Sequence, residues 1–251
     1  MINNKKEFWK DWKRKTKMEE KAIKSLIKGK QIIIKNIPKE EIIAIYAKGS
    51  FIRRDMNKNS DVDFVTVLKT KKYLKKLKTL SKQIKDKYYP KIQFGSGYTL
   101  WELKTGKKIN IKGSDKPNPS RINKHFPHYK LLYGEDVNKL RLHYKEDIRL
   151  LNGLIKTFHN LFLPNYGKKK MEFSEVVKQV FWLVEFEQRS LGKNVPHSWK
   201  LLTKSIKDKN HIIHNTLKYR LHPTKDKKLC SQYIKKLKRY LNNLEKRLNI
   251  S

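Results

Sequence analysis

The sequence predicts an α+β protein in two parts, a small mixed β-sheet flanked by helices and then an all-α helical bundle. Short apolar runs of strand-like composition occur before residue 112, and beyond Val137 they give way to long segments of helical periodicity. A chain of 251 residues is long enough for two domains. We therefore expect domains at residues 1–134 and 135–251.

The first part begins with a helix and two strands. Residues 5–30 space their apolar side chains at helical intervals among lysines, which predicts an amphipathic helix with a break near residues 14–17. Residues 42–47 and 62–68 are apolar runs typical of buried strands. Residues 71–87 return to helical spacing, so a helix should follow the second strand.

A hairpin and a loop should complete the first part. Residues 98–103 follow two glycines and precede a Thr-Gly-Lys turn, after which residues 109–111 would form the returning strand. Residues 113–127 contain three prolines and a glycine, which predict an irregular loop.

The second part has the pattern of a helical bundle. Prolines at 164, 196 and 223 separate its apolar-periodic segments. A bundle of four or five helices fits the segments, which are residues 148–162, 176–186, 199–206, 212–221 and 229–248.

The chain is strongly basic, with 61 Lys+Arg against 23 Asp+Glu and a formal net charge of +38. Such a charge suits a polyanionic partner, for example tRNA, another nucleic acid or a nucleoside triphosphate. Only 10 of the 61 are arginines, and the lysines are spread along the whole chain, as an AT-rich genome or a heat-adapted proteome would also produce. Two interpretations stay open: a polyanion-binding surface, or solvated lysine-rich faces.

The cysteine content and the first residues predict a cytoplasmic protein. Cys230 is the only cysteine, which excludes an internal disulfide. Residues 1–30 are charged throughout and lack the continuous apolar segment of a signal peptide or a membrane span.

The strongest chemical signal lies between the two apolar runs. Gly49-Ser50 follows the first run, and Asp61 and Asp63 lie at the start of the second run. Side chains two residues apart on a strand point to the same face, so these carboxylates should project together. Paired carboxylates suit divalent cations with a preference for hard oxygen ligands, and a Gly-Ser turn offers backbone N–H groups and a hydroxyl to a phosphate.

The residues that carry this signal also form a family pattern: Gly-Ser, an arginine three residues later, and Ser-Asp-x-Asp closing a run of about fifteen. The matching positions are Gly49, Ser50, Arg53, Ser60, Asp61 and Asp63. From residue 40 to about 112 the chain resembles the nucleotidyltransferase family of the DNA polymerase beta superfamily. At Arg54 it departs from the family, because many relatives have glycine there.

The resemblance implies the nucleotidyltransferase fold and transfer of a nucleoside monophosphate, with ATP as the favoured donor, onto an acceptor hydroxyl with release of pyrophosphate. Attack on the α-phosphate builds charge that two divalent ions can stabilise. Asp61 and Asp63 are the expected ligands of two Mg²⁺ ions and the expected catalytic pair. The expected triphosphate-binding residues are Gly49, Ser50, Arg53 and Ser60, with Lys48 or Arg54 as further neutralising charges.

A third carboxylate usually completes such a site, as a further metal ligand or as the general base. We expect Glu102 in this role, because it would lie mid-strand beside the Asp-x-Asp strand, although a register slip of one residue would turn it away. Glu185 and Glu187 are alternatives, since some relatives supply the base from their helical domain.

The acceptor stays open between an RNA such as tRNA, a protein hydroxyl and a small molecule. Aminoglycoside adenylyltransferases share the two-domain layout, but a chain of charge +38 would repel their polycationic substrate unless the cleft were acidic. The alternative function is an antitoxin-like protein that binds nucleic acid or a protein partner on the same scaffold with little turnover. The intact pair Asp61 and Asp63 argues against that alternative, because a retired site has no need for adjacent like charges.

Overall fold

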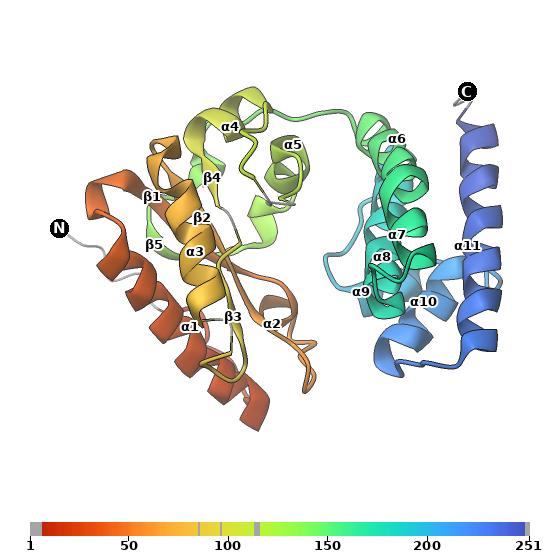
Figure 1. Ribbon diagram of the computed structural model, residues 1–251, viewed down its shortest axis with the longest axis horizontal. Helices are drawn as coiled ribbons and strands as arrows, with labels where there is room; N and C mark the ends of the chain where they lie inside the picture. The colour runs from red at the N-terminus through yellow and green to blue at the C-terminus, as the bar shows by residue number, and fades with distance from the viewer. Residues whose placement is uncertain (1–6, 85, 96, 113–115, 249–251) are drawn as a thin grey trace. The chain divides into compact units, whose positions relative to one another are not determined.

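A computed structural model describes residues 7–84, 86–95, 97–112 and 116–248, and the chain divides into two compact units, Met1–Tyr144 and Lys145–Ser251 (Figure 1). The first unit is a mixed sheet flanked by helices and the second is helical. The predicted fold class is therefore confirmed.

The first unit is built on a five-stranded sheet (Figure 1). Its centre is the antiparallel pair β1 (Ile42–Lys48) and β2 (Val62–Leu68), which are the two predicted strands. On the far side of β1 lies β5 (Lys130–Gly134), also antiparallel, which was not predicted. The short strands β3 (Ile92–Gln93) and β4 (Tyr98–Thr99) pair in parallel with the two ends of β2.

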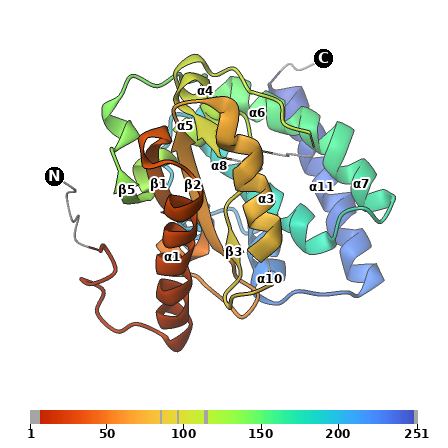
Figure 2. The same ribbon diagram turned by 60° about the vertical axis from the view of Figure 1, so that its left-hand side comes forward.

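Helices cover both faces of this sheet. On one face lie α1 (Lys17–Asn36) and α3 (Leu74–Ile84), as Figures 1 and 2 show. Their buried apolar side chains belong to one core cluster with Val62 and Phe64 of β2. The other face carries a second core cluster, to which the short helices α4 (Leu100–Thr105) and α5 (Pro119–Asn123) contribute Leu103 and Ile122, and β1 and β2 contribute alternate residues. Because the central strands are buried on both faces, they are apolar almost throughout.

The predicted N-terminal helix lies further along the chain than residues 5–30, since it begins at the predicted break and ends at Asn36. It begins at Lys17 because Thr16 caps it: the Thr16 hydroxyl accepts a hydrogen bond from the Glu19 N–H (3.2 Å), and the Glu19 carboxylate accepts one from the Thr16 N–H (2.8 Å). Of the described residues before it, 7–16, positions 8–11 form a turn and none is helical.

The predicted hairpin over residues 98–111 is wrong. Only Tyr98–Thr99 is a strand, α4 follows it directly, and residues 109–111 have no regular structure. Thr99 and Glu102 start the helix as a capping box, in which Thr99 Oγ1 accepts from the Glu102 N–H (3.2 Å) and Glu102 Oε2 accepts from the Thr99 N–H (2.9 Å). The sequence Thr-x-x-Glu is the local signal for this helix start.

The predicted irregular loop over residues 113–127 also contains regular structure in its described part, 116–127. Asn118 caps α5, since its side-chain oxygen accepts a hydrogen bond from the Ser120 N–H (3.0 Å), and Pro119 occupies the first helical position, where no N–H partner is needed. Residues 113–115 lie outside the described residues.

The second unit is a helical bundle, as predicted. Its central helix α8 (Phe173–Ser190) is apolar on most sides and is surrounded by the others. These are α6 (Asp147–Thr157), α7 (Leu163–Gly167), α9 (Trp199–Ser205), α10 (Ile212–Leu221) and α11 (Lys227–Arg247). No helix among the described residues is long and apolar enough to cross a membrane.

A buried carboxylate joins α8 to α10 and α11. Glu187 is 4% exposed and accepts hydrogen bonds from the Tyr240 hydroxyl and from Arg247 Nη2 (2.6 Å), with His211 Nε2 at 3.4 Å. Burial alone would raise the pKa of Glu187, but the hydrogen bonds from His211, Tyr240 and Arg247 outweigh it and lower that pKa to about 2.

We expect Glu187→Gln to destabilise the second unit at neutral pH but hardly at low pH. A pKa lowered from 4.5 to about 2 corresponds to about 3 kcal/mol at about 1.4 kcal/mol per pKa unit. This stabilisation is present above about pH 5 and is lost as the pH falls toward 2, because the carboxylate is then protonated.

Urea unfolding of the wild type and the variant at pH 7 and pH 3 measures the difference. Glu175→Gln is the matched control on the same helix, because Glu175 is half-exposed and its ion pair with Lys178 contributes little. An equal loss for Glu187→Gln at both pH values would contradict the expectation.

Candidate active site

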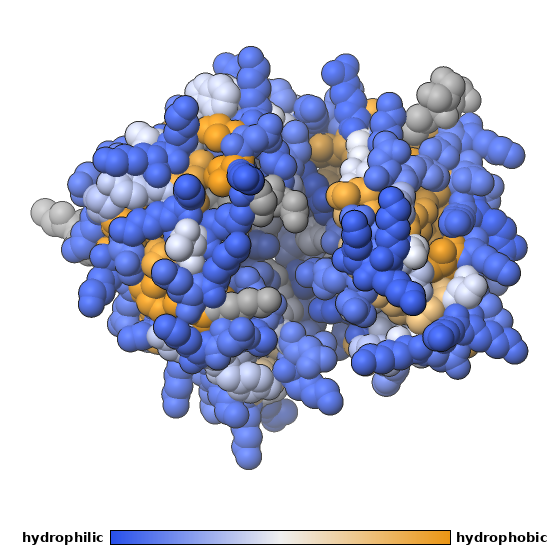
Figure 3. All heavy atoms as spheres, in the orientation of Figure 1, coloured by the Kyte–Doolittle hydropathy of each residue, from blue (hydrophilic) through white to orange (hydrophobic). Residues whose placement is uncertain are grey.

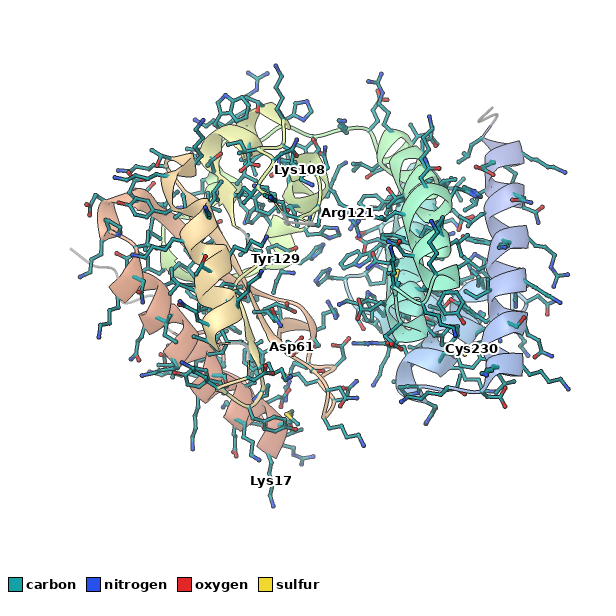
Figure 4. The ribbon with its side chains drawn as sticks, in the orientation of Figure 1. Lys17, Asp61, Lys108, Arg121, Tyr129 and Cys230 are labelled. Atoms are coloured by element: carbon teal, nitrogen blue, oxygen red, sulfur yellow. The ribbon has the colours of Figure 1, made fainter. Side chains whose placement is uncertain are left out.

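Asp61 and Asp63 lie together at the start of β2. Asp63 is within the strand and Asp61 immediately precedes it, and both are partly exposed, whereas Val62 between them and Phe64 after them are buried. The alternation of the strand therefore turns both carboxylates to the face opposite Val62 and Phe64. The side chain of Asp61 is labelled in Figure 4, where β2 begins.

The Gly-Ser turn is brought directly against Asp63. Lys48, the last residue of β1, pairs across the sheet with Asp63, so Gly49 follows at the level of the carboxylate. A Cβ atom added to Gly49 would collide with Asp63 Oδ2 and lie 3.3 Å from its Cγ. Gly49 also has a φ of +82°, which disfavours any L side chain. Two independent constraints thus require glycine at this position.

A cation stands beside the same carboxylate. Lys48 Nζ lies 4.0 Å from Asp63 Oδ1, and both side chains are about one-third exposed, at 33% each. Contacts at this distance and exposure stabilise the fold only weakly. The lysine therefore remains available to other anions that enter the site.

Ser50 and Arg53 belong to the short helix α2 (Ser50–Arg53), for which Gly49 is the N-cap. Ser50 is buried at the first position. Arg53 Nε donates to Asp55 Oδ2 (3.0 Å), and its side chain is only 6% exposed. The Arg53 side chain is thus held against the turn that follows α2.

Ser60 fixes the loop that leads to the carboxylates. Its hydroxyl accepts a hydrogen bond from the Asn57 N–H (2.9 Å), and its own N–H donates to the Asn57 carbonyl (2.9 Å). The side chain is buried directly before Asp61. Ser60 therefore orients the start of β2.

Arg54, where many relatives have glycine, adopts a left-handed conformation with φ 55°. Hydrogen bonds of its guanidinium offset the cost of this conformation. Nε and Nη2 donate to the two oxygens of Glu19 (2.8 and 3.1 Å), and Nη2 also donates to the Arg14 carbonyl (2.8 Å). It also stacks over Trp12, 4.8 Å from the ring centre. The hydrogen bond from Arg54 lowers the pKa of Glu19. These contacts explain how a non-glycine residue holds this turn.

Glu102 is placed differently from the prediction. It lies in α4, is 0% exposed, and forms an ion pair with Lys116 Nζ (2.6 Å), while the Ile109 N–H donates to Oε1 (2.8 Å). Within the residues that the structure describes, no three His, Cys, Asp or Glu side chains form a group able to hold a metal ion. Glu102 is therefore not brought to Asp61 and Asp63.

The two alternatives to Glu102 are buried in the second unit. Glu185 is held by Arg189, whose Nε donates to Oε1 at 3.1 Å. Glu187 is held by the network described above. Both carboxylates are thus engaged within the bundle.

A cavity of about 270 Å³ adjoins Lys48, a feature that the sequence did not indicate. Phe64 and Phe94 meet edge to face in its wall, with ring centres 5.4 Å apart, and Lys116 and Tyr98 also line it. These residues come from four separate segments, so only the folded chain brings them together.

The Gly-Ser turn and the carboxylate pair lie in the part of the chain that a family model matches. Residues 26–114 match the family model described as "Nucleotidyltransferase domain", which confirms the resemblance seen in the motif. No curated protein matches the chain.

Among solved structures, the chain is similar to spectinomycin adenyltransferase AAD(9) from Enterococcus faecialis, whose crystal structure is with ATP and spectinomycin. The TM-score is 0.54 at 17% sequence identity, and the match covers 90% of this chain and 99% of that chain. At this identity the likeness concerns the fold alone.

Proposed function

We propose that this protein is a metal-dependent nucleotidyltransferase. It would transfer a nucleoside monophosphate, with AMP from ATP favoured, onto an acceptor hydroxyl and release pyrophosphate. The match of residues 26–114 supports the reaction class. The single observation that carries the proposal is the approach of Gly49 to the Asp63 carboxylate, which joins a phosphate-binding turn and a carboxylate pair in one site.

The donor set fits magnesium. Asp61 and Asp63 offer hard oxygen ligands on a partly exposed strand start, and Mg²⁺ commonly binds through one or two carboxylates, substrate phosphates and water. Bound ions would stabilise the charge that develops on the α-phosphate and the leaving pyrophosphate.

The other residues would hold the triphosphate and shape the turn. The backbone at Gly49 and Ser50 can approach phosphate oxygens closely because no Cβ intervenes at position 49. Lys48 would offset phosphate charge, whereas Ser60, Arg53 and the buried Glu102 would keep the surrounding loops in place.

Two classes of acceptor each have an observation in their favour. The structural neighbour was crystallised with spectinomycin, which favours a small hydroxyl-bearing molecule. The net charge of +38 favours RNA, because a basic surface attracts phosphates and repels a polycation. Both classes belong in the test.

The test is turnover of labelled nucleoside triphosphates with Mg²⁺ and a panel of acceptors: total RNA, lysate proteins, spectinomycin and other aminoglycosides. We expect pyrophosphate release and transfer of label from ATP to one acceptor class. The proposal fails if no acceptor supports pyrophosphate release and if Asp61→Asn with Asp63→Asn leaves triphosphate binding unchanged.

We expect Gly49→Ala to lower kcat/KM for this reaction by about 100-fold or more. The new Cβ would displace the Asp63 carboxylate, and a shift of about 1 Å in a reacting group can cost that much. Alanine at this positive φ should also lower the free energy of unfolding of the variant by about 1–2 kcal/mol.

Gly192→Ala is the matched control, because Gly192 has a φ of +74° but no atom within 4 Å of its added Cβ. Pyrophosphate release and thermal unfolding measured on both variants separate strain from collision. A similar loss of activity in the two variants would contradict a specific role for Gly49.

A further inference from the structure

The second unit contains a groove of about 1000 Å³ whose lining is strongly basic. It is bounded by the end of α8, the segment between α9 and α10, and one face of α11. Hydrophilic side chains cover much of the visible surface of this unit in Figure 3. Six cationic side chains line the groove against two carboxylates: Lys193, Lys207, Lys236, Arg239, Lys246 and Arg247 against Glu187 and Asp208.

Helix α11 supplies a continuous stripe of this lining. Its contributions fall at spacings of three and four residues, which places them on one face of the helix: Lys236, Arg239, Tyr240, Asn243, Lys246 and Arg247. At about 1.5 Å per residue, the stripe extends for roughly 16 Å. Such a length exceeds a single phosphate group and suits an extended chain of them.

The two carboxylates leave most of the positive charge uncompensated. Glu187 is buried and already paired with Arg247 (2.6 Å). Asp208 accepts a hydrogen bond from the Asn210 N–H (2.8 Å) in its own turn. Arg239 and Lys246 are exposed on the groove face, where their charges are available to an anionic ligand.

We propose that this groove binds the phosphate backbone of single-stranded RNA. Arg239 and Lys246 would contact phosphates, and the amides of Asn210 and Asn243 would reach sugars or bases. The groove lies within the second unit, so its binding of RNA does not depend on the proposed transfer reaction. A polycationic aminoglycoside would be repelled from it.

The test measures fluorescence anisotropy of a labelled 12-nucleotide oligouridylate with the full chain, between 50 and 200 mM KCl. The groove variant is Arg239→Gln with Lys246→Gln. The matched control is Lys235→Gln with Lys238→Gln, which removes the same charge from exposed residues of α11 outside the groove. Circular dichroism checks that both variants stay folded.

We expect the groove variant to bind about tenfold more weakly and to lower the slope of log K against log salt by about 1.4, or about 0.7 for each lost phosphate contact. The control should change affinity less than about twofold. Equal losses in both variants would overturn the proposal in favour of a general lysine background. Unchanged oligouridylate binding by the groove variant would overturn it as well. The same holds for a competition experiment in which tripolyphosphate binds the groove but displaces no RNA. Loss of pyrophosphate release in the transfer assay would leave these outcomes unchanged.

Discussion

Asp63→Asn is expected to slow nucleotidyl transfer by at least about 1000-fold, with Asp61→Asn close behind. Metal-held charge stabilisation of this kind contributes several kcal/mol to the transition state, and each 1.4 kcal/mol is about tenfold in rate. Asparagine keeps the size of the side chain but removes the negative charge. Because Asp63 contacts Gly49, its loss affects both the carboxylate pair and the phosphate turn.

The same substitution should not destabilise the fold. Asp61 and Asp63 are like charges two residues apart on a strand, and the contact of Asp63 with Lys48 at 4.0 Å is weak. If the pair is functional, single-turnover assays with labelled ATP should show loss of transfer, whereas thermal unfolding should show unchanged stability. Asp86→Asn is the control, since that carboxylate is 74% exposed in its ion pair with Lys91. Transfer within tenfold of wild type in Asp63→Asn would refute the assignment.

The candidate site motif could be predicted because its information is local. Gly49, Asp61 and Asp63 lie within one short stretch, and the alternation of a single strand fixes the common face of the two carboxylates. The collision that excludes any other residue at Gly49 comes from strand pairing, which the sequence does not specify.

The structure around Glu102 was not predicted correctly from the sequence. Its apolar neighbours suggested a strand, but the hydrogen bonds with Thr99 start a helix instead, and its ion partner Lys116 is fourteen positions away in the chain. The capping box is a local signal that outweighs the apolar neighbours, whereas the ion pair with Lys116 is a tertiary contact that no local pattern specifies. The strand β5 escaped prediction for a similar reason, because its side chains are mostly half-exposed and it is defined by pairing with β1.

The helical bundle is the opposite case. Helix α8 repeats apolar residues over eighteen positions, and this periodicity predicts both its presence and its central place in the core. Periodicity does not reveal that Glu187 is buried within it, since the partners Tyr240 and Arg247 come from another helix.

Glu102→Gln is expected to lower the free energy of unfolding of the first unit by about 3–5 kcal/mol. The Glu102–Lys116 pair is almost fully enclosed, with side-chain exposures of 0% and 4%. Removal of one partner from such a pair leaves an uncompensated buried charge. Burial already lowers the pKa of Lys116, and the hydrogen bond and charge of Glu102 oppose that effect.

The pH dependence of stability tests whether the uncompensated charge of Lys116 causes the loss. Without the carboxylate, the pKa of Lys116 should fall further below its usual 10.5, so the variant should gain stability as the pH rises toward that value and the lysine becomes neutral. The wild type should show a smaller gain, because Glu102 keeps the pKa of Lys116 closer to its usual value.

The double variant Glu102→Leu with Lys116→Met should recover part of the lost stability, because two apolar side chains leave no charge to desolvate. The recovery is partial because the N–H groups of Thr99 and Ile109 lose their acceptor. Urea unfolding at pH 7 and pH 9.5 measures all three proteins. A catalytic Glu102 would behave otherwise: Glu102→Gln would abolish transfer at unchanged stability, and the double variant would be inactive although stable. Because the carboxylate of Glu102 is engaged with Lys116 and the Ile109 N–H, we expect the double variant to retain transfer, which would assign Glu102 to the architecture of the first unit.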